Sequence, residues 1–119
     1  MDSSRYMLTM RDRPAWLVYP RAFCHLVEQS FVHVPPWHLF EAQEALVRLR
    51  GLADRYPSRE LLPFAYRQGD DDIACWSRGE GEKVYVIHDF ASPGWESGGQ
   101  FEDTWSWLRA AVEDCIKWA

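Results

Sequence analysis

The sequence lacks the features that mark secreted, disulfide-stabilised and membrane proteins. Its cysteines, Cys24, Cys75 and Cys115, are an odd number at wide spacing, which makes a poor disulfide framework and is typical of a reducing compartment. No stretch approaches the roughly 20 apolar residues of a membrane span. The first residues contain no basic segment followed by an apolar run, as a secretory signal would. We therefore expect a cytoplasmic protein that does not enter a membrane.

Motifs for metal binding, nucleotide binding and covalent catalysis are also scarce. The histidines and cysteines show no Cys-x-x-Cys or His-x-x-x-His spacing that would hold zinc, and Ser77 and Ser92 have no nucleophile-elbow motif around them. The glycine-containing segment 79–82 includes Glu80 and Glu82, whose charge would repel a phosphate group. We therefore expect no catalytic residue, no cofactor and no metal.

What the chain does contain is enough apolar material for one folded domain. Its 119 residues are 47% hydrophobic and 26% charged, a composition that excludes a disordered tail and a coiled-coil rod. A chain of this length buries roughly two thirds of its extended surface, so it needs neither a metal nor a disulfide to fold. We expect residues 1–119 to form a single domain.

Charge is distributed unevenly along the chain. Residues 1–69 carry nine arginines and seven acidic residues, whereas residues 70–119 carry four basic and eleven acidic residues. A net charge of −7 in the second part opposes contact with nucleic-acid phosphates and favours a basic protein partner through electrostatic steering. A solvated, solubilising face is the alternative explanation of the same charges.

Two helices are predicted in the first half of the chain, after a loop at 1–18. Pro20 can begin the first helix, over 20–29, because a missing amide hydrogen costs nothing at the first helical position. The second helix begins after Pro36 and stops at Pro57. Its apolar residues recur at steps of three and four, which places them on one face: Leu39, Ala42, Leu46, Leu49, Ala53 and Tyr56.

Three strands are predicted next, at 61–67, 72–78 and 83–90, because these runs are rich in β-branched and aromatic residues. The turn-forming segments 68–71 and 79–82 separate them, which implies an antiparallel meander. A loop over 91–100 and a final helix complete the chain. Asp103 can cap this helix, and its apolar stripe is Trp105, Leu108, Val112, Cys115 and Ala119.

Single residues refine the expected sheet. Pro63 has no amide hydrogen to give to a ladder, so it predicts that the first strand lies at an edge. His88 alternates with other inward-facing residues of its strand, which predicts a partly buried imidazole and no catalytic role. The run from Asp70 to Asp72 indicates a turn more than a cation site, because Asp tolerates turn geometry and no EF-hand spacing follows.

The expected fold class is therefore α+β: an antiparallel meander with helices packed on one face, N-terminal helices and a closing C-terminal helix. In such a meander the 68–71 turn and the 91–101 loop lie at one end of the sheet, together with the start of the final helix. This arrangement predicts an acidic rim that includes Glu102 and Asp103. Its partner-binding residues are predicted to be Asp70, Asp71, Asp72, Asp89, Trp95 and Glu96.

Several segments of the second half are similar to a known family. These are Leu61-Leu62-Pro63-Phe64-Ala65, the run from Asp70 to Trp76, and the run from Val84 to Phe90 followed by a loop and a Trp-rich helix. Together they resemble the SUKH superfamily, which groups fungal Smi/Knr-type cell-wall regulators with bacterial immunity proteins. The resemblance covers residues 57–119 and implies an α+β fold without a cofactor. It also implies a non-enzymatic role, the binding and neutralisation of a polymorphic toxin that is often a nuclease.

The residues thus favour a protein-binding module, a monomer or homodimer, with a basic partner, and the resemblance implies that this partner is a toxin domain. Two other classes stay open. A small enzyme could use carboxylates such as Asp72 and Asp89, and would need an acid with a raised pKa in a cleft. A domain with exposed aromatic residues could instead serve only to build a homo-oligomer.

Overall fold

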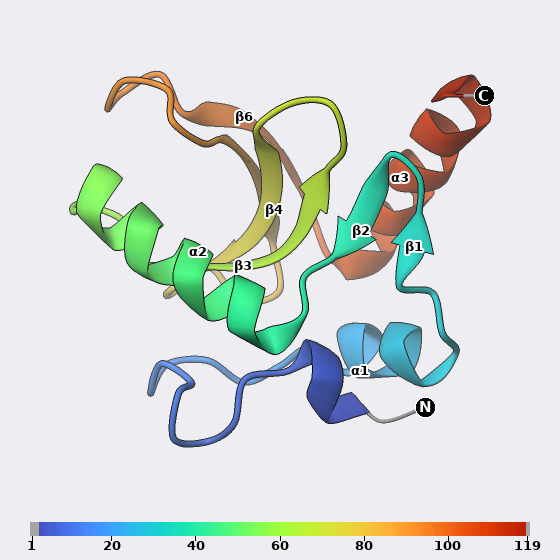
Figure 1. Cartoon of the computed structure of the whole chain (residues 1–119), viewed down its shortest axis with the longest axis horizontal. Helices are drawn as coiled ribbons and strands as arrows, with labels where there is room; N and C mark the ends of the chain where they lie inside the picture. Colours follow the sequence, from blue (N-terminus) through green and yellow to red (C-terminus); the bar gives the residue numbers. More distant parts are fainter. Residues whose placement is uncertain (1–2, 119) are drawn as a thin grey trace.

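The computed structural model of the chain describes residues 3–118 and, within that range, is built around one six-stranded antiparallel sheet (Figure 1). Each strand pairs with the strand that comes next in the sequence, so the sheet is a simple meander. The strands predicted from the sequence are the third to fifth of this set. The full set is β1 (His33–Val34), β2 (Trp37–Leu39), β3 (Leu61–Arg67), β4 (Asp72–Ser77), β5 (Val84–His88) and β6 (Ser97–Phe101).

Helices precede and follow the sheet. They are η1 (a 3₁₀ turn, Ser3–Tyr6), α1 (Arg21–Glu28), α2 (Ala42–Arg55) and α3 (Thr104–Trp118). The apolar face predicted for 20–29 is buried in α1 through Phe23, Leu26 and Val27. Asp103 accepts a hydrogen bond from the Ser106 N–H at 2.8 Å and so caps α3 as expected. The α+β class, with a meander sheet, N-terminal helices and a closing C-terminal helix, is confirmed.

Helices cover both faces of the sheet, a more even distribution than the one-faced packing expected above. Alternate residues of β4 enter two separate hydrophobic clusters, because successive side chains of a strand point to opposite faces. Ala74 and Trp76 pack with side chains of α1 and α3, whereas Ile73 and Cys75 pack with side chains of α2. In Figure 1, α2 accordingly lies to the left of the sheet and α3 to its right.

The second helix begins later than predicted, because the residues after Pro36 form a strand. Trp37 and Leu39 are buried and His38 is half-buried, a period of two that fits pairing of β2 with β3. The helix starts only where Glu41 and Glu44 form a capping box, each side chain bonding the backbone of the other residue. The prediction that this helix begins directly after Pro36 was therefore wrong.

The prediction that Pro63 places its strand at an edge was also wrong. β3 lies between β2 and β4, in the interior of the sheet. A register shift between Pro63 and Ala65 interrupts the ladder with β4, and such a bulge is one of the few interior sites that accept a proline.

The segment predicted as a loop at 91–101 contains the edge strand β6, and this strand changes the position of α3. Phe101 pairs with Val84, at the end of β5 that is remote from His88. Glu102 and Asp103 therefore lie at the opposite end of the sheet from the 68–71 turn, and the prediction that they share its rim was wrong. The physical reason is that β6 runs back along β5 for five residues and so carries the chain to the other end of the sheet. The sequence indicates a loop there because Gly98 and Gly99 are typical turn formers.

α3 docks through a different face than its apolar stripe predicted. The buried residues of the helix are Thr104, Trp107 and Ala111. By contrast, Trp105 and Val112 are exposed, and the other described members of the predicted stripe are only partly buried. Ala119, which was also assigned to the stripe, lies outside the described residues.

Candidate functional site

The turn at 68–71 and the loop after β5 meet at one end of the sheet, as predicted. The Asp89 N–H donates to the Asp71 carbonyl at 3.1 Å, and the His88 N–H donates to the Glu96 carbonyl at 2.7 Å. These two bonds tie the segment 88–96, which we call the aromatic loop, both to the preceding turn and back onto itself. All six residues predicted to bind a partner lie on this loop or on the turn and strand start beside it.

Asp89 is nonetheless a buried structural residue, because its carboxylate is fully enclosed by arginines. Arg55 donates to it through Nε and Nη2, at 2.7 Å each, and Arg48 donates through Nη1 at 3.1 Å. The same carboxylate accepts the Phe90 N–H at 2.8 Å. Asp89 is therefore unable to contact a partner directly, which corrects its assignment to the binding surface.

Glu96 has the same structural role at the other end of the loop. It is buried, accepts Arg59 Nη1 at 3.0 Å, and accepts the Gly94 N–H at 2.7 Å. Hydrogen bonds from its own backbone N–H and from Arg59 hold the pKa of Glu96 below its ordinary value. Its burial corrects its assignment as a partner-binding acid of the rim in the same way.

The two arginines that neutralise Asp89 were not predicted from the sequence to belong to this site. Arg48 and Arg55 are seven residues apart on α2, a spacing that places both on one face of the helix. This face points at the aromatic loop, where the two side chains meet Asp89. The spacing was a usable signal, but the acid that they bind is 34 residues beyond Arg55 and nothing local identifies it.

The three neighbouring aspartates behave differently from one another. Asp70 accepts the Asp72 N–H at 2.9 Å and pairs with Arg67 at 2.7 Å, which supports the turn interpretation of this run. Asp71 is exposed. Asp72 contacts the ring Nδ1 of His88, whose side chain is about half exposed, so the imidazole is hydrogen-bonded as expected but less covered than an inward-facing strand position suggests. His88 lies at the last position of its strand, beyond the cover of the core.

Phe90 and Trp95 are exposed aromatic side chains of the aromatic loop, at 58% and 78% relative exposure. Phe90 has a φ of 69°, which is unusual for a bulky residue, and its ring lies 4.1 Å from the Arg55 guanidinium. Tyr56 fixes the backbone below, since its hydroxyl donates to the Ala91 carbonyl at 2.7 Å. Burial raises the pKa of Tyr56, so this hydroxyl remains a donor at neutral pH.

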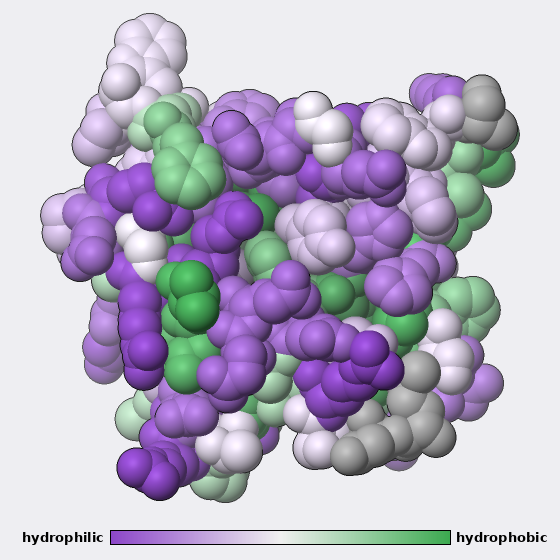
Figure 2. Space-filling model, viewed as in Figure 1, coloured by the Kyte–Doolittle hydropathy of each residue, from purple (hydrophilic) through white to green (hydrophobic). Residues whose placement is uncertain are grey.

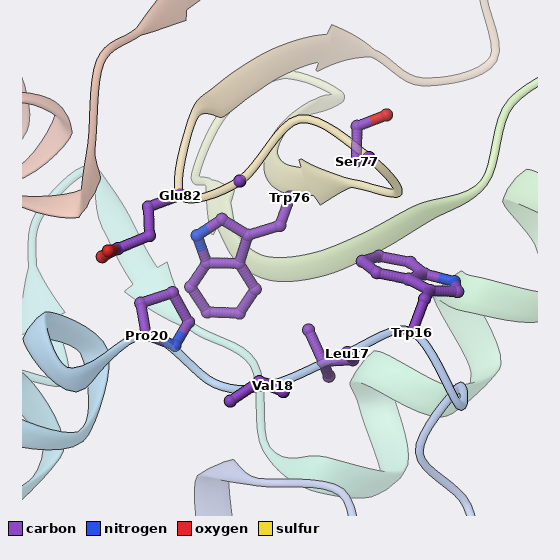
Figure 3. A pocket seen from close by; sticks show the side chains of 9 residues that line it. Trp16, Leu17, Val18, Pro20, Trp76, Ser77 and Glu82 are labelled. Carbon is purple, nitrogen blue, oxygen red and sulfur yellow. The ribbon is translucent and has the colours of Figure 1, made fainter.

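A hollow that could hold a small molecule lies at the other end of the sheet, beside Trp76 (Figure 3). This cavity of about 300 Å³ is lined by Trp16, Val18 and other apolar residues. Its lining contains one hydroxyl, from Ser77, and one carboxylate, from Glu82, which project on opposite sides of the Trp76 ring in Figure 3. The cavity therefore lacks the adjacent nucleophile and base that covalent catalysis requires.

Within residues 3–118 the side chains form no other catalytic or metal-binding arrangement. The His88–Asp72 pair has the composition of an acid–base dyad, but neither residue lines the cavity beside Trp76, and no hydroxyl or thiol bonds to the ring. No group of three His, Cys, Asp or Glu side chains in this range converges to hold a metal ion. Within the same range, every helix is too short or too polar to cross a lipid bilayer.

Comparison with protein-family models, curated proteins and solved structures returns no match to this chain. The resemblance to the SUKH superfamily stays a prediction drawn from the segments quoted above.

Proposed function

We propose that this chain is a non-enzymatic binding module that docks on another protein through the aromatic loop. The observation that carries the proposal is the combination of exposed side chains and a fixed backbone. Phe90 and Trp95 are largely exposed, while the loop between them is held from below by Asp89, Glu96 and Tyr56. Large aromatic side chains dominate binding energy at protein interfaces, and a preorganised loop loses little entropy when it binds.

The backbone of Phe90 adds a second argument. A left-handed conformation costs an L-residue roughly 1–2 kcal/mol, and such strain is retained mainly at functional sites. Glycine or asparagine would satisfy this position more cheaply if only the turn mattered. A phenylalanine there presents a ring to solvent at an energetic cost to the fold, which is expected of a contact residue.

The partner that fits this surface best is a basic protein. Asp71 is exposed beside the loop, and Asp70 and Asp72 contribute partly screened carboxylates to the same rim. Together with the net charge of −7 over residues 70–119, these acids favour steering of a cationic partner. The SUKH resemblance supports a cytoplasmic immunity protein that covers the substrate surface of a nuclease toxin. In this proposal Trp95, Phe90 and Asp70 to Asp72 make the contact, while Asp89 and Glu96 support it.

The test uses the basic C-terminal domain of a secreted protein encoded beside this gene, in a catalytically inactive form. Trp95→Ala should weaken binding about 30-fold or more, as expected for an interface hot spot. Asp71→Lys should slow association and reduce its dependence on salt. Val18→Ala is the matched control, because Val18 is 83% exposed at the other end of the sheet. Equal affinities for all four proteins would refute the assignment of the surface.

A further inference from the structure

α3 carries two apolar stripes, and the body of the protein covers only one of them. At about 100° per residue, Thr104, Trp107 and Ala111 span an arc of about 60°, and all three are buried. The adjoining arc of about 80° contains Leu108, Val112, Trp105 and Ile116. Val112 and Ile116 are 43% and 66% exposed, and nothing in the described residues covers them.

The exposed stripe continues onto the neighbouring β1 side of the molecule. Phe31 is 54% exposed and shares a shallow hollow with Leu108. We call these five residues the α3 patch: Phe31, Trp105, Leu108, Val112 and Ile116. Hydrophobic surface gathers along the right margin of Figure 2, where α3 lies in Figure 1. Contiguous apolar patches on soluble domains mark interaction sites.

We infer that the α3 patch binds the same patch of a second copy of this chain, with the two α3 helices antiparallel about a twofold axis. The spacing of its residues is self-complementary. Leu108 and Ile116 lie one turn before and one turn after Val112, each about 6 Å away along the helix. A twofold axis through Val112 therefore places Val112 against Val112 and Leu108 against Ile116 of the second copy.

Charges beside the patch obey the same symmetry. Arg109 and Glu113 are exposed on the solvent flank of the exposed stripe, one turn apart and opposite in sign. The axis through Val112 brings Arg109 to within about 3 Å, measured along the helix, of Glu113 of the second copy. Both side chains are long enough to bridge this offset. The twofold axis repeats the Arg109–Glu113 ion pair, so the dimer contains it twice. A second copy thus meets both charges of this flank with their opposites, and this complementarity identifies it as the occupant of the patch.

One helix and one flanking side chain on each side make a small interface, so the dimer should be reversible and in the micromolar range. Analytical ultracentrifugation of the full chain across about 1 μM to 1 mM measures it. Val112→Glu and Ile116→Glu should weaken dimerisation about 100-fold or more, because each places a charge inside the apolar contact, at its centre for Val112 and against Leu108 of the second copy for Ile116. Val47→Glu is the control, since Val47 is 69% exposed on α2 and should leave the dimer intact.

A charge exchange separates self-association from other uses of the patch. Arg109→Glu and Glu113→Arg should each weaken the dimer several-fold by placing like charges opposite one another, and the double variant should restore it. Both positions are exposed, so these variants should fold normally, and circular dichroism checks this for each of them.

A protein that stays monomeric at 1 mM, or that dimerises equally well with Val112→Glu, would overturn the inference. Failure of the double variant to recover would overturn the antiparallel arrangement. Trp95→Ala should leave the dimer unchanged, so the outcome is separate from that of the toxin-binding experiment.

Discussion

The aromatic loop and α3 both expose large apolar side chains, yet different forces fix them to the rest of the molecule. Behind the loop lie two buried carboxylates held by three arginines. Behind α3 lies Trp107, whose ring contacts Trp37 and Phe64 at centroid distances of 5.6 and 5.0 Å. Irregular backbone needs directional bonds at particular atoms, whereas a helix satisfies its own backbone and needs only a packed face.

This difference predicts that the two surfaces fail in different ways. A surface held by ion pairs should respond to the loss of one charge and to acid. A surface held by packing should respond to lost volume and be less sensitive to pH. The outward-facing residues of both surfaces make few contacts with the rest of the protein, so substitutions there should affect binding more than stability.

The largest expected effect is at the packed anchor of α3. Trp107→Ala should lower the free energy of unfolding by about 3–5 kcal/mol, because it removes a fully packed ring and leaves a cavity. Urea denaturation followed by circular dichroism measures the change. The matched variant Trp105→Ala should cost less than about 1 kcal/mol, since this ring lies at the surface. Similar losses for both tryptophans would contradict the assignment of the docking face.

The charged anchor of the loop comes next. Asp89→Asn should lower the free energy of unfolding by about 3 kcal/mol, because it leaves Arg48 and Arg55 facing a neutral amide in a largely buried site. Proteolysis should shift to residues near 90–95, while α3 should keep its amide protection. Asp71→Asn, at an exposed site, should cost less than about 0.5 kcal/mol. A loop that remains protease-resistant without the Asp89 charge would show that Tyr56 and the backbone suffice to hold it.

Much of the sheet could be predicted from the sequence, because β3, β4, β5 and α1 are long enough for their apolar periods to be visible. The remainder was hidden for physical reasons. β2 has three residues, which is too short for a period, and its pairing depends on β3 more than 20 residues later. In α3 both stripes are apolar, so periodicity shows that the helix is amphipathic without showing which stripe the body covers.

The candidate site was predicted in position but only partly in role. The tight turns at 68–71 and 79–82 imply that successive strands run in opposite directions. Asp70, Asp71, Asp72 and the loop after β5 could therefore be placed at one end of the sheet. Burial of Asp89 could not be predicted from neighbouring residues, because its partners come from α2. This helix packs on the face of the sheet opposite α3, whereas the sequence predicted all helices on one face. The exposure of Trp95 was consistent with its place between turn-forming residues.

Acid should loosen the loop at Glu96. Its pKa in the folded protein lies below the ordinary value of 4.5, so the unfolded chain takes up this proton first as the pH falls. The stabilisation by this carboxylate is therefore complete above pH 4.5 and is lost as the pH drops through the lower folded-state pKa. The Gly94 amide, which donates to this carboxylate, should report the titration in NMR spectra with a midpoint below 4.5. A midpoint above that value would contradict the Arg59 contact, and Glu96→Gln should abolish the shift.

The smallest expected effect on stability is at Phe90, where two terms nearly cancel. Phe90→Gly relieves a left-handed backbone that costs roughly 1–2 kcal/mol, but it removes contacts of the ring with Arg55 and Arg48, worth about 0.5–1 kcal/mol each. The free energy of unfolding should thus stay within about 1 kcal/mol of the parent value. Binding of the toxin domain should nevertheless fall about tenfold or more, because the ring is an exposed contact. A variant that gains stability and retains full affinity would show that the strain at Phe90 serves something other than recognition. That result would shift the contact to Trp95 alone.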